Sequence, residues 1–154
     1  MEQLTTQNLL SEEALKGLKP LESAVEYLAS FSERFNWVGV YILVGDVLVL
    51  STYKGAATEH THIRVGDGVC GTAVALGVDQ NVPNVHDRAN YLACSVETKS
   101  ELVVLIRNTA GNIVGQIDID SHVMNAFGER EEKEVQKLAK ILGQNWDAIL
   151  KTVS

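Results

Sequence analysis

Two pairs of β-prone segments, each joined by a short turn, constrain the fold of this chain more than any other feature. Residues 37–44 and 47–53 are rich in Val, Ile, Leu and Tyr, and Gly45-Asp46 between them suits a tight turn. The same pattern returns in residues 102–107 and 113–120, on either side of a polar turn. Each pair predicts a β-hairpin, and each hairpin supplies two antiparallel strands.

Helical patterns flank these hairpins. Between Leu21 and Phe35 the apolar residues recur every three or four positions, as on one face of an amphipathic helix, and Pro20 suits its first turn. Ser11 begins a shorter helix ahead of it. Residues 135–150 keep the same apolar spacing after an acidic start. The sequence therefore predicts helices at both ends of the chain.

Shorter elements lie between the two hairpins. Residues 69–76 are expected to form a helix that ends at Gly77, and residues 61–65 an extended segment. Residues 80–83 are typical of a short strand stopped by proline, and residues 84–100 of a long polar connection. Hairpins bounded by terminal helices predict an α+β domain with one mainly antiparallel sheet, helices on one face and a pocket on the other.

Length and composition narrow the classes of protein to which the chain can belong. Its 154 residues, 45% of them hydrophobic, suffice for one core, so we expect a single domain over residues 1–154 with a helical extension at about 1–20. A net charge of −7 without clustered Lys or Arg argues against nucleic acid as a partner. The chain has neither an apolar run of membrane-spanning length nor a signal-like start, so we expect a cytoplasmic protein without membrane association.

The two cysteines, Cys70 and Cys94, are candidates for thiol chemistry. Glycines flank Cys70 and a polar stretch precedes Cys94, so neither lies in an apolar run where cysteine serves as a small core residue. In a reducing compartment they are free thiols or a transient catalytic pair rather than a structural disulfide. Cys70 begins the short helix, where backbone N–H groups stabilise a thiolate. Two unreactive thiols are the alternative.

Three acidic residues are candidates for a common site. Asp118 and Asp120 are two positions apart near the end of a predicted strand, so they share one face, with Ile119 on the other. Glu101 comes just before the preceding strand and is expected to converge with them. Three carboxylates in one pocket repel, so at least one holds a proton near neutral pH, and such a cluster can bind an ammonium group. The alternative is the wet face of a half-exposed strand.

The aromatic and histidine residues are weaker candidates for a functional site than the cysteines and acids. Trp37 and Tyr41 are four positions apart and share a strand face, either as an aromatic wall or as core side chains. His60, His62 and His86 are weak candidates for a metal site, because neither a helical His-Glu-x-x-His nor a Cys-x-x-Cys pattern accompanies them. We expect no metal and no cofactor.

Six motifs occur in order from the first long helix onward: Asn36-Trp37-Val38-Gly39-Val40-Tyr41, Gly66-Asp67-Gly68-Val69-Cys70-Gly71-Thr72-Ala73, Pro83-Asn84-Val85-His86, Ala93-Cys94, Ser100-Glu101-Leu102-Val103-Val104 and Gly115-Gln116-Ile117-Asp118-Ile119-Asp120-Ser121. In this order and spacing the chain resembles the GAF-domain free methionine-(R)-sulfoxide reductases. The resemblance implies a six-stranded antiparallel sheet with flanking helices, and a closed pocket for free methionine sulfoxide.

The resemblance also implies roles for individual residues. Cys94 matches the nucleophile, which attacks the sulfoxide sulfur and becomes a sulfenic acid; another thiol then forms a disulfide that thioredoxin reduces. Trp37 and Tyr41 match the residues that wall the pocket. Glu101, Asp118 and Asp120 match the acids that hold the substrate amino group and assist proton transfer.

Three positions depart from the family pattern. His60 stands where typical members carry a third, usually resolving, cysteine; Ser95 replaces a common acid, and Leu105 replaces a proline. Either Cys70 or an external thiol would then resolve Cys94. Two other classes stay open: a non-catalytic GAF domain that binds or senses a small molecule, and a structural or interaction domain. A homodimer through the terminal helices is compatible with every class.

Overall fold

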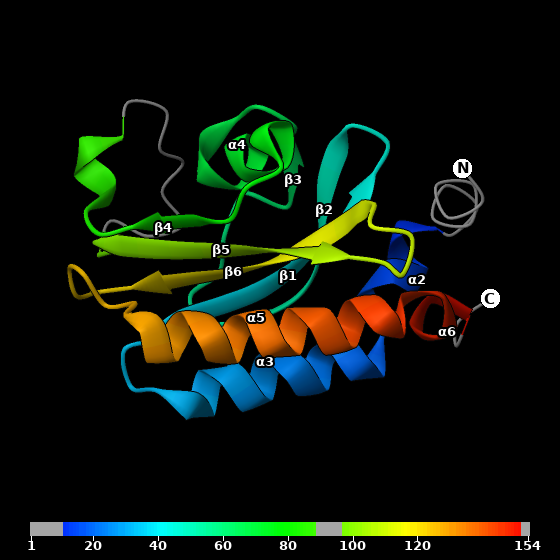
Figure 1. Cartoon of the computed structure of the whole chain (residues 1–154), viewed down its shortest axis with the longest axis horizontal. Coiled ribbons are helices and arrows are strands. Elements are labelled where there is room, and N and C mark those ends of the chain that lie inside the picture. Colours follow the sequence, from blue (N-terminus) through cyan, green and yellow to red (C-terminus); the bar gives the residue numbers. More distant parts are fainter. Residues whose placement is uncertain (1–10, 89–96, 152–154) are drawn as a thin grey trace.

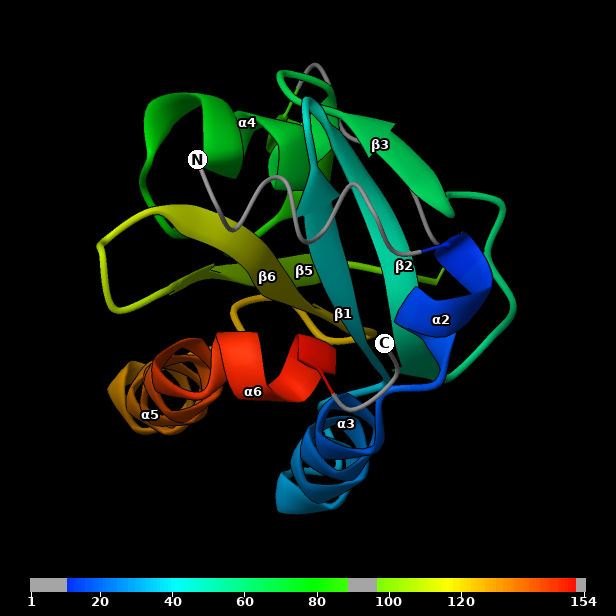
Figure 2. The same ribbon diagram turned by 90° about the vertical axis from the view of Figure 1, so that its right-hand side faces the viewer.

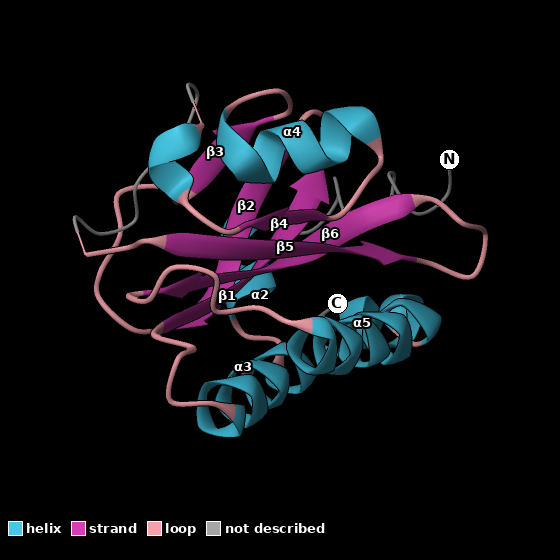
Figure 3. Ribbon diagram, turned by 60° about the vertical axis from the view of Figure 1, so that its left-hand side comes forward, coloured by secondary structure: helices cyan, strands magenta, loops and turns pink. Residues whose placement is uncertain are grey.

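The computed structural model describes residues 11–88 and 97–151, and its strands form a single sheet. In the described residues the strand order is β3-β2-β1-β6-β5-β4, and every neighbouring pair is antiparallel. Helices α3 and α5 lie against one face of this sheet, and α4 lies on the other (Figures 1 and 3). The predicted α+β architecture is confirmed.

The two predicted hairpins form the centre of the sheet. The first joins β1 (Trp37–Val44) to β2 (Val47–Lys54), and its turn contains Gly45 with φ of 63°, a conformation that suits glycine. The second joins β5 (Ser100–Arg107) to β6 (Ile113–Ser121). Pairing of β1 with β6 unites the hairpins into four adjacent strands at the centre of the sheet.

Short strands complete the two edges of the sheet. Strand β3 (His62–Arg64) pairs with β2, and β4 (Gln80–Val82) pairs with β5, as the extended patterns predict. Between them runs α4 (Gly68–Leu76), which ends at Gly77 in a left-handed conformation with φ of 67°. The single-turn helix η1 (Val85–Asp87) follows β4 within the connection expected to be polar and irregular.

The terminal helices differ in length from the predictions. Helix α3 (Lys19–Phe31) ends four residues before Phe35, because Ser32 already has extended backbone angles. The C-terminal helix is divided into α5 (Glu129–Gln144) and α6 (Trp146–Lys151). Figure 2 shows α6 and α3 on the same side of the sheet, with the short α2 (Glu12–Lys16) near β2. The side-chain oxygen of Ser11 caps α2, as expected.

Each face of the sheet carries its own hydrophobic core. Leu102, Ile117 and Ile119 belong to the core beneath α3 and α5. Trp37, Tyr41 and Cys70 belong to the core beneath α4. Because strand residues alternate between faces, the neighbours of Ile117 and Ile119 on β6 point to the α4 side. No helix in the described part of the chain combines the length and apolar character that a membrane span requires.

Candidate active site

The three acidic residues converge on the α4 face of the sheet. Glu101 on β5 pairs in register with Asp120 on β6, and Asp118 lies two residues along the same face. Their exposed fractions are 3%, 1% and 1% for Glu101, Asp118 and Asp120. The alternative that Asp118 and Asp120 form the wet face of a half-exposed strand is therefore wrong.

Helix α4 brings Cys70 onto this acidic cluster. The Cys70 thiol donates a weak hydrogen bond to Oε2 of Glu101, with a sulfur–oxygen distance of 3.8 Å. The side-chain amide of Gln116 on β6 donates to the Cys70 carbonyl oxygen at 3.0 Å. Gln116 is fully buried on the same strand face as Asp118. Strand alternation could have identified this positioning residue from the sequence, because Gln116, Asp118 and Asp120 are evenly spaced.

The start of α4 can approach the sheet because Gly71 has no side chain. A Cβ at this position would lie 2.4 Å from the Arg64 carbonyl oxygen. The Gly71 amide donates to the Asp67 carbonyl at 2.8 Å, and its own carbonyl accepts from Gly66 at 2.9 Å. The glycine-rich segment thus folds tightly against the end of β3 and holds Cys70 above the acids.

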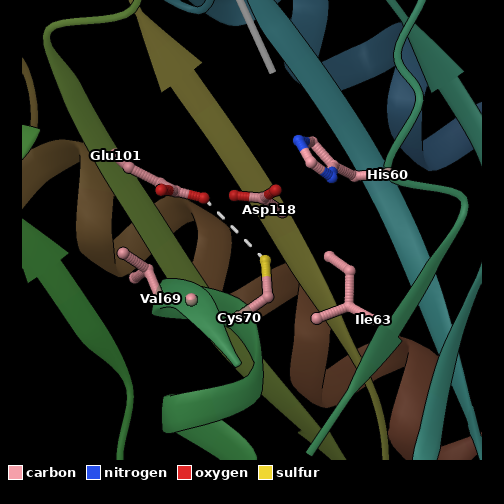
Figure 4. A pocket seen from close by; sticks show the side chains of 7 residues that line it. His60, Ile63, Val69, Cys70, Glu101 and Asp118 are labelled. Atoms are coloured by element: carbon pink, nitrogen blue, oxygen red, sulfur yellow. Dashed lines mark hydrogen bonds between the residues drawn. The ribbon is translucent and has the colours of Figure 1, made fainter. Parts of the chain in front are cut away.

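A small cavity lies between these groups. Its volume is about 10 Å³, and its lining includes His60, Ile63, Cys70, Glu101 and Asp118. Glu101, Asp118 and Cys70 point toward one another, and the His60 ring points toward Asp118 (Figure 4). This volume is about that of one water-sized sphere, so the cavity accommodates one small group or ion.

Burial and mutual repulsion change the acidity of the cluster. Burial raises the pKa of Glu101 well above its usual range, and the carboxylates of Asp118 and Asp120 raise it further. Burial also raises the pKa of Asp118, although the nearby Glu101, Cys70 and His60 oppose that rise. Of Glu101 and Asp118, Glu101 is the acid that its surroundings favour more strongly in the protonated form, which is the direction expected for neighbouring carboxylates.

The same environment keeps Cys70 protonated. Burial raises the pKa of the Cys70 thiol well above its usual range, and the charges of Asp118 and Glu101 raise it further. The prediction that a helix start stabilises a Cys70 thiolate is therefore wrong. The reason is that Cys70 is 4% exposed and meets carboxylates, whose negative charge opposes a second anion.

The aromatic pair lies on the same face but does not line the small cavity. The indole N–H of Trp37 donates to the Ala56 carbonyl at 3.0 Å, and its ring stacks on Tyr53 with centroids 5.5 Å apart. The hydroxyl of Tyr41 donates to the His60 carbonyl at 2.7 Å. Both side chains are buried in the core beneath α4. Tyr41 therefore helps to hold the backbone that presents His60 to the acids.

The remaining candidates lie apart from the cluster. His62 is exposed and contacts Glu12 on α2, and His86 is exposed on η1. The predicted nucleophile Cys94 lies outside the described residues, so its predicted role stays a prediction.

The chain is similar to proteins of known structure and name, although no protein-family model matches it. It is 39% identical over 117 residues to GAF domain-containing protein A of Dictyostelium discoideum, covering 74% of this chain and 73% of that protein. It is 31% identical to the type II free methionine-R-sulfoxide reductase of Thermoplasma acidophilum, with a TM-score of 0.81 over 92% of this chain and 96% of that one.

A third similarity concerns a structure solved with its substrate. The free methionine-R-sulfoxide reductase of Neisseria meningitidis is 30% identical, with a TM-score of 0.78 over 99% of this chain and 89% of that one. Sequence identity at this level over nearly the full length of both chains shows common family membership. The fold of a GAF domain and the buried acid cluster agree with it. The chain belongs to the family of GAF-domain free methionine-R-sulfoxide reductases.

Proposed function

We propose that this protein reduces free methionine-(R)-sulfoxide to methionine, with Cys94 as the nucleophile. The observation that carries the proposal is the buried cluster of Glu101, Asp118 and Asp120 beside Cys70. Carboxylates clustered in a buried site are costly and are retained where they act on a ligand. Membership in the family supports the choice of substrate, because two related reductases carry its name and one was solved in complex with its substrate.

The proposed reaction transfers one oxygen atom. The Cys94 thiolate attacks the sulfoxide sulfur while a proton is delivered to the sulfoxide oxygen. Methionine leaves, and Cys94 becomes a sulfenic acid that carries the oxygen. Two external thiol groups then reduce the sulfenic acid, giving one disulfide, one water molecule and the regenerated Cys94 thiol.

The acidic cluster supplies both a proton and negative charge. The raised pKa of Glu101 favours its protonated form, which can donate to the sulfoxide oxygen as a general acid. Asp118 and Asp120 offer carboxylate oxygens to the substrate ammonium group. The cavity of about 10 Å³ among Cys70, Glu101 and Asp118 fits one group of that size.

An external dithiol of the thioredoxin class is the reductant that we propose. Resolution requires a thiolate that attacks the sulfenic acid. Cys70 is poorly suited to this step, because burial raises the pKa of its thiol and carboxylates surround it. His60, at the position of the family's usual resolving cysteine, has no thiol. We therefore favour an external thiol over Cys70.

A turnover assay with purified stereoisomers tests the proposal. Protein, thioredoxin with its reducing system and free methionine-(R)-sulfoxide should yield methionine over many turnovers, and the S isomer and peptide-bound sulfoxide should not. Cys94→Ser should abolish the reaction, whereas Cys70→Ser should still turn over repeatedly. Binding of the sulfoxide without turnover would contradict the enzyme and favour a small-molecule sensor.

A further inference from the structure

The cavity among Cys70, Glu101 and Asp118 has the form of a site for a small cation. One ligand atom from each of these three residues lies within 4.8 Å of the others. All three side chains are buried, with exposed fractions of 4%, 3% and 1%. A sulfur and two carboxylate oxygens thus face one space whose volume is about 10 Å³.

The side chain of Asp118 is the second observation that points to a ligand. Neither of its carboxylate oxygens accepts a hydrogen bond of ordinary geometry from the described residues, although Glu101 and Cys70 are close enough to share a proton with it. Asp118 nevertheless points into the cavity (Figure 4). A buried carboxylate in this position gains a partner when a cation enters.

The spacing of the donors fits a tetrahedral metal ion. Sulfur and oxygen atoms held about 2.3 and about 2.1 Å from zinc at the tetrahedral angle are about 3.6 Å apart. The Cys70 sulfur and Glu101 oxygen are 3.8 Å apart. The ligand atoms of Cys70, Glu101 and Asp118 all lie within 4.8 Å of one another. This limit exceeds the tetrahedral separation by about 1 Å, a difference that rotation of the carboxylate side chains can remove.

His60 is the candidate for a fourth ligand, and its ring must move closer to bind, because it is not among the donors that lie within 4.8 Å of one another. Its ring lines the same cavity and points toward Asp118 (Figure 4). Its backbone is held by two hydrogen bonds, from the Tyr41 hydroxyl to its carbonyl at 2.7 Å and from its amide to Thr58 at 3.0 Å. Thiolate, imidazole and carboxylate are the donors that select zinc and similar borderline cations over calcium or magnesium.

We propose that Cys70, His60, Glu101 and Asp118 form a binding site for one zinc ion or a similar divalent transition metal. The Cys70 thiol gives its proton to solvent when its sulfur coordinates the metal, and Glu101, when protonated, gives up its proton in the same way before its carboxylate binds. The site stands independently of the proposed function. One consequence rests on that function: a metal ion occupies the space among the acids and excludes the substrate ammonium group.

Cobalt substitution tests the site in the full-length protein. The reduced protein, freed of chelator and reductant under anaerobic conditions, is titrated with Co²⁺. The expected result is one equivalent bound with sulfur-to-cobalt charge-transfer absorption and tetrahedral d–d bands, both displaced by Zn²⁺. Cys70→Ser should remove the charge-transfer absorption, and His60→Gln should weaken binding at least about 10-fold. Circular dichroism and the melting temperature identify any variant that fails to fold.

Two matched variants separate this site from other metal-binding groups. Cys94→Ser keeps one thiol, and His62→Gln removes a neighbouring exposed imidazole that contacts Glu12. Both should retain the cobalt spectrum and affinity of the unsubstituted protein. The proposal is overturned if Co²⁺ gives no charge-transfer absorption, if that absorption follows Cys94 instead of Cys70, or if His62→Gln weakens binding as much as His60→Gln.

Discussion

Replacing Glu101 by Gln should stabilise the protein and impair the reaction at the same time. The cavity-facing oxygens of Glu101 and Asp118 lie within 4.8 Å of each other. Two unit charges 4.8 Å apart in a surrounding of effective dielectric constant about 20 repel by about 3 to 4 kcal/mol. The protein avoids this repulsion by keeping a proton on Glu101. Holding that proton at a pH well above the usual pKa of a carboxyl group lowers the free energy of unfolding by a similar amount.

The sign of the pH dependence follows from the raised pKa of Glu101. In the unfolded chain this residue ionises near its usual pKa of about 4.3, whereas in the folded protein it stays protonated to higher pH. Unfolding therefore releases a proton in this window, so the stabilisation present below pH 4.3 is lost progressively as the pH rises toward the folded-state pKa. A glutamine cannot ionise, so the variant lacks this loss.

Urea unfolding from about pH 4 to 8, in the presence of a metal chelator, measures the effect. At about pH 8 we expect the free energy of unfolding of Glu101→Gln to exceed that of the unsubstituted protein by about 1 to 4 kcal/mol, with the difference shrinking toward pH 4. The matched control Glu26→Gln changes an exposed residue of α3 and should have no such effect. A difference that is absent, or that grows as the pH falls, would refute the repulsion argument.

The activity of the same variant should fall. Loss of a general acid costs about 10²- to 10⁴-fold in rate, so kcat for free methionine-(R)-sulfoxide should drop by a factor in this range. An unchanged kcat would remove Glu101 from the proposed mechanism. A more stable and less active variant is the signature of a residue retained for chemistry rather than for folding.

Four further substitutions test how the site is positioned. Gly71→Ala places a Cβ 2.4 Å from the Arg64 carbonyl and should lower the free energy of unfolding by about 1 to 3 kcal/mol, measured by thermal denaturation; an unchanged melting temperature would show that α4 is not held so closely. Gln116→Leu removes the donor to the Cys70 carbonyl and should destabilise the protein by about 1 to 3 kcal/mol in urea, so a gain in stability would contradict this role. Trp37→Phe loses the hydrogen bond to Ala56 and should lower the free energy of unfolding by about 1 kcal/mol. Tyr53→Leu keeps that bond but removes the stacking on Trp37, and should lower the free energy of unfolding by a similar amount. Neutral effects of both substitutions would show that the Trp37 ring is not held in place.

Local patterns in the sequence predict the parts of the site that lie on single strands. Alternation alone placed Asp118 and Asp120 on one face, because each step along a strand reverses the side-chain direction. Hairpin order then brought Glu101 beside Asp120. Helix ends were less predictable: Phe35 continues the helical spacing of α3, yet it reaches the core from the turn that follows the helix, and its ring centroid lies 5.6 Å from that of Phe127.

Contacts between distant segments could not be predicted from local patterns. The carbonyl of Cys70 meets Gln116, 46 residues along the chain, and its sulfur meets Glu101, 31 residues along. These contacts depend on how closely α4 approaches the sheet, and they reverse the acidity expected for a thiol at a helix start. The position of His60 near the acids likewise depends on the course of the connection between β2 and β3. That connection has no repeating pattern of apolar residues from which its course could be predicted.

The most direct test of the central claim is a single-turnover measurement without any external reductant. Prereduced protein is mixed with excess free methionine-(R)-sulfoxide, and the methionine formed per chain is counted while the oxidised cysteine is identified by mass spectrometry. The proposed function predicts one methionine per chain with the oxygen on Cys94, and none from Cys94→Ser. Formation of no methionine, or of equal amounts by Cys94→Ser, would contradict it.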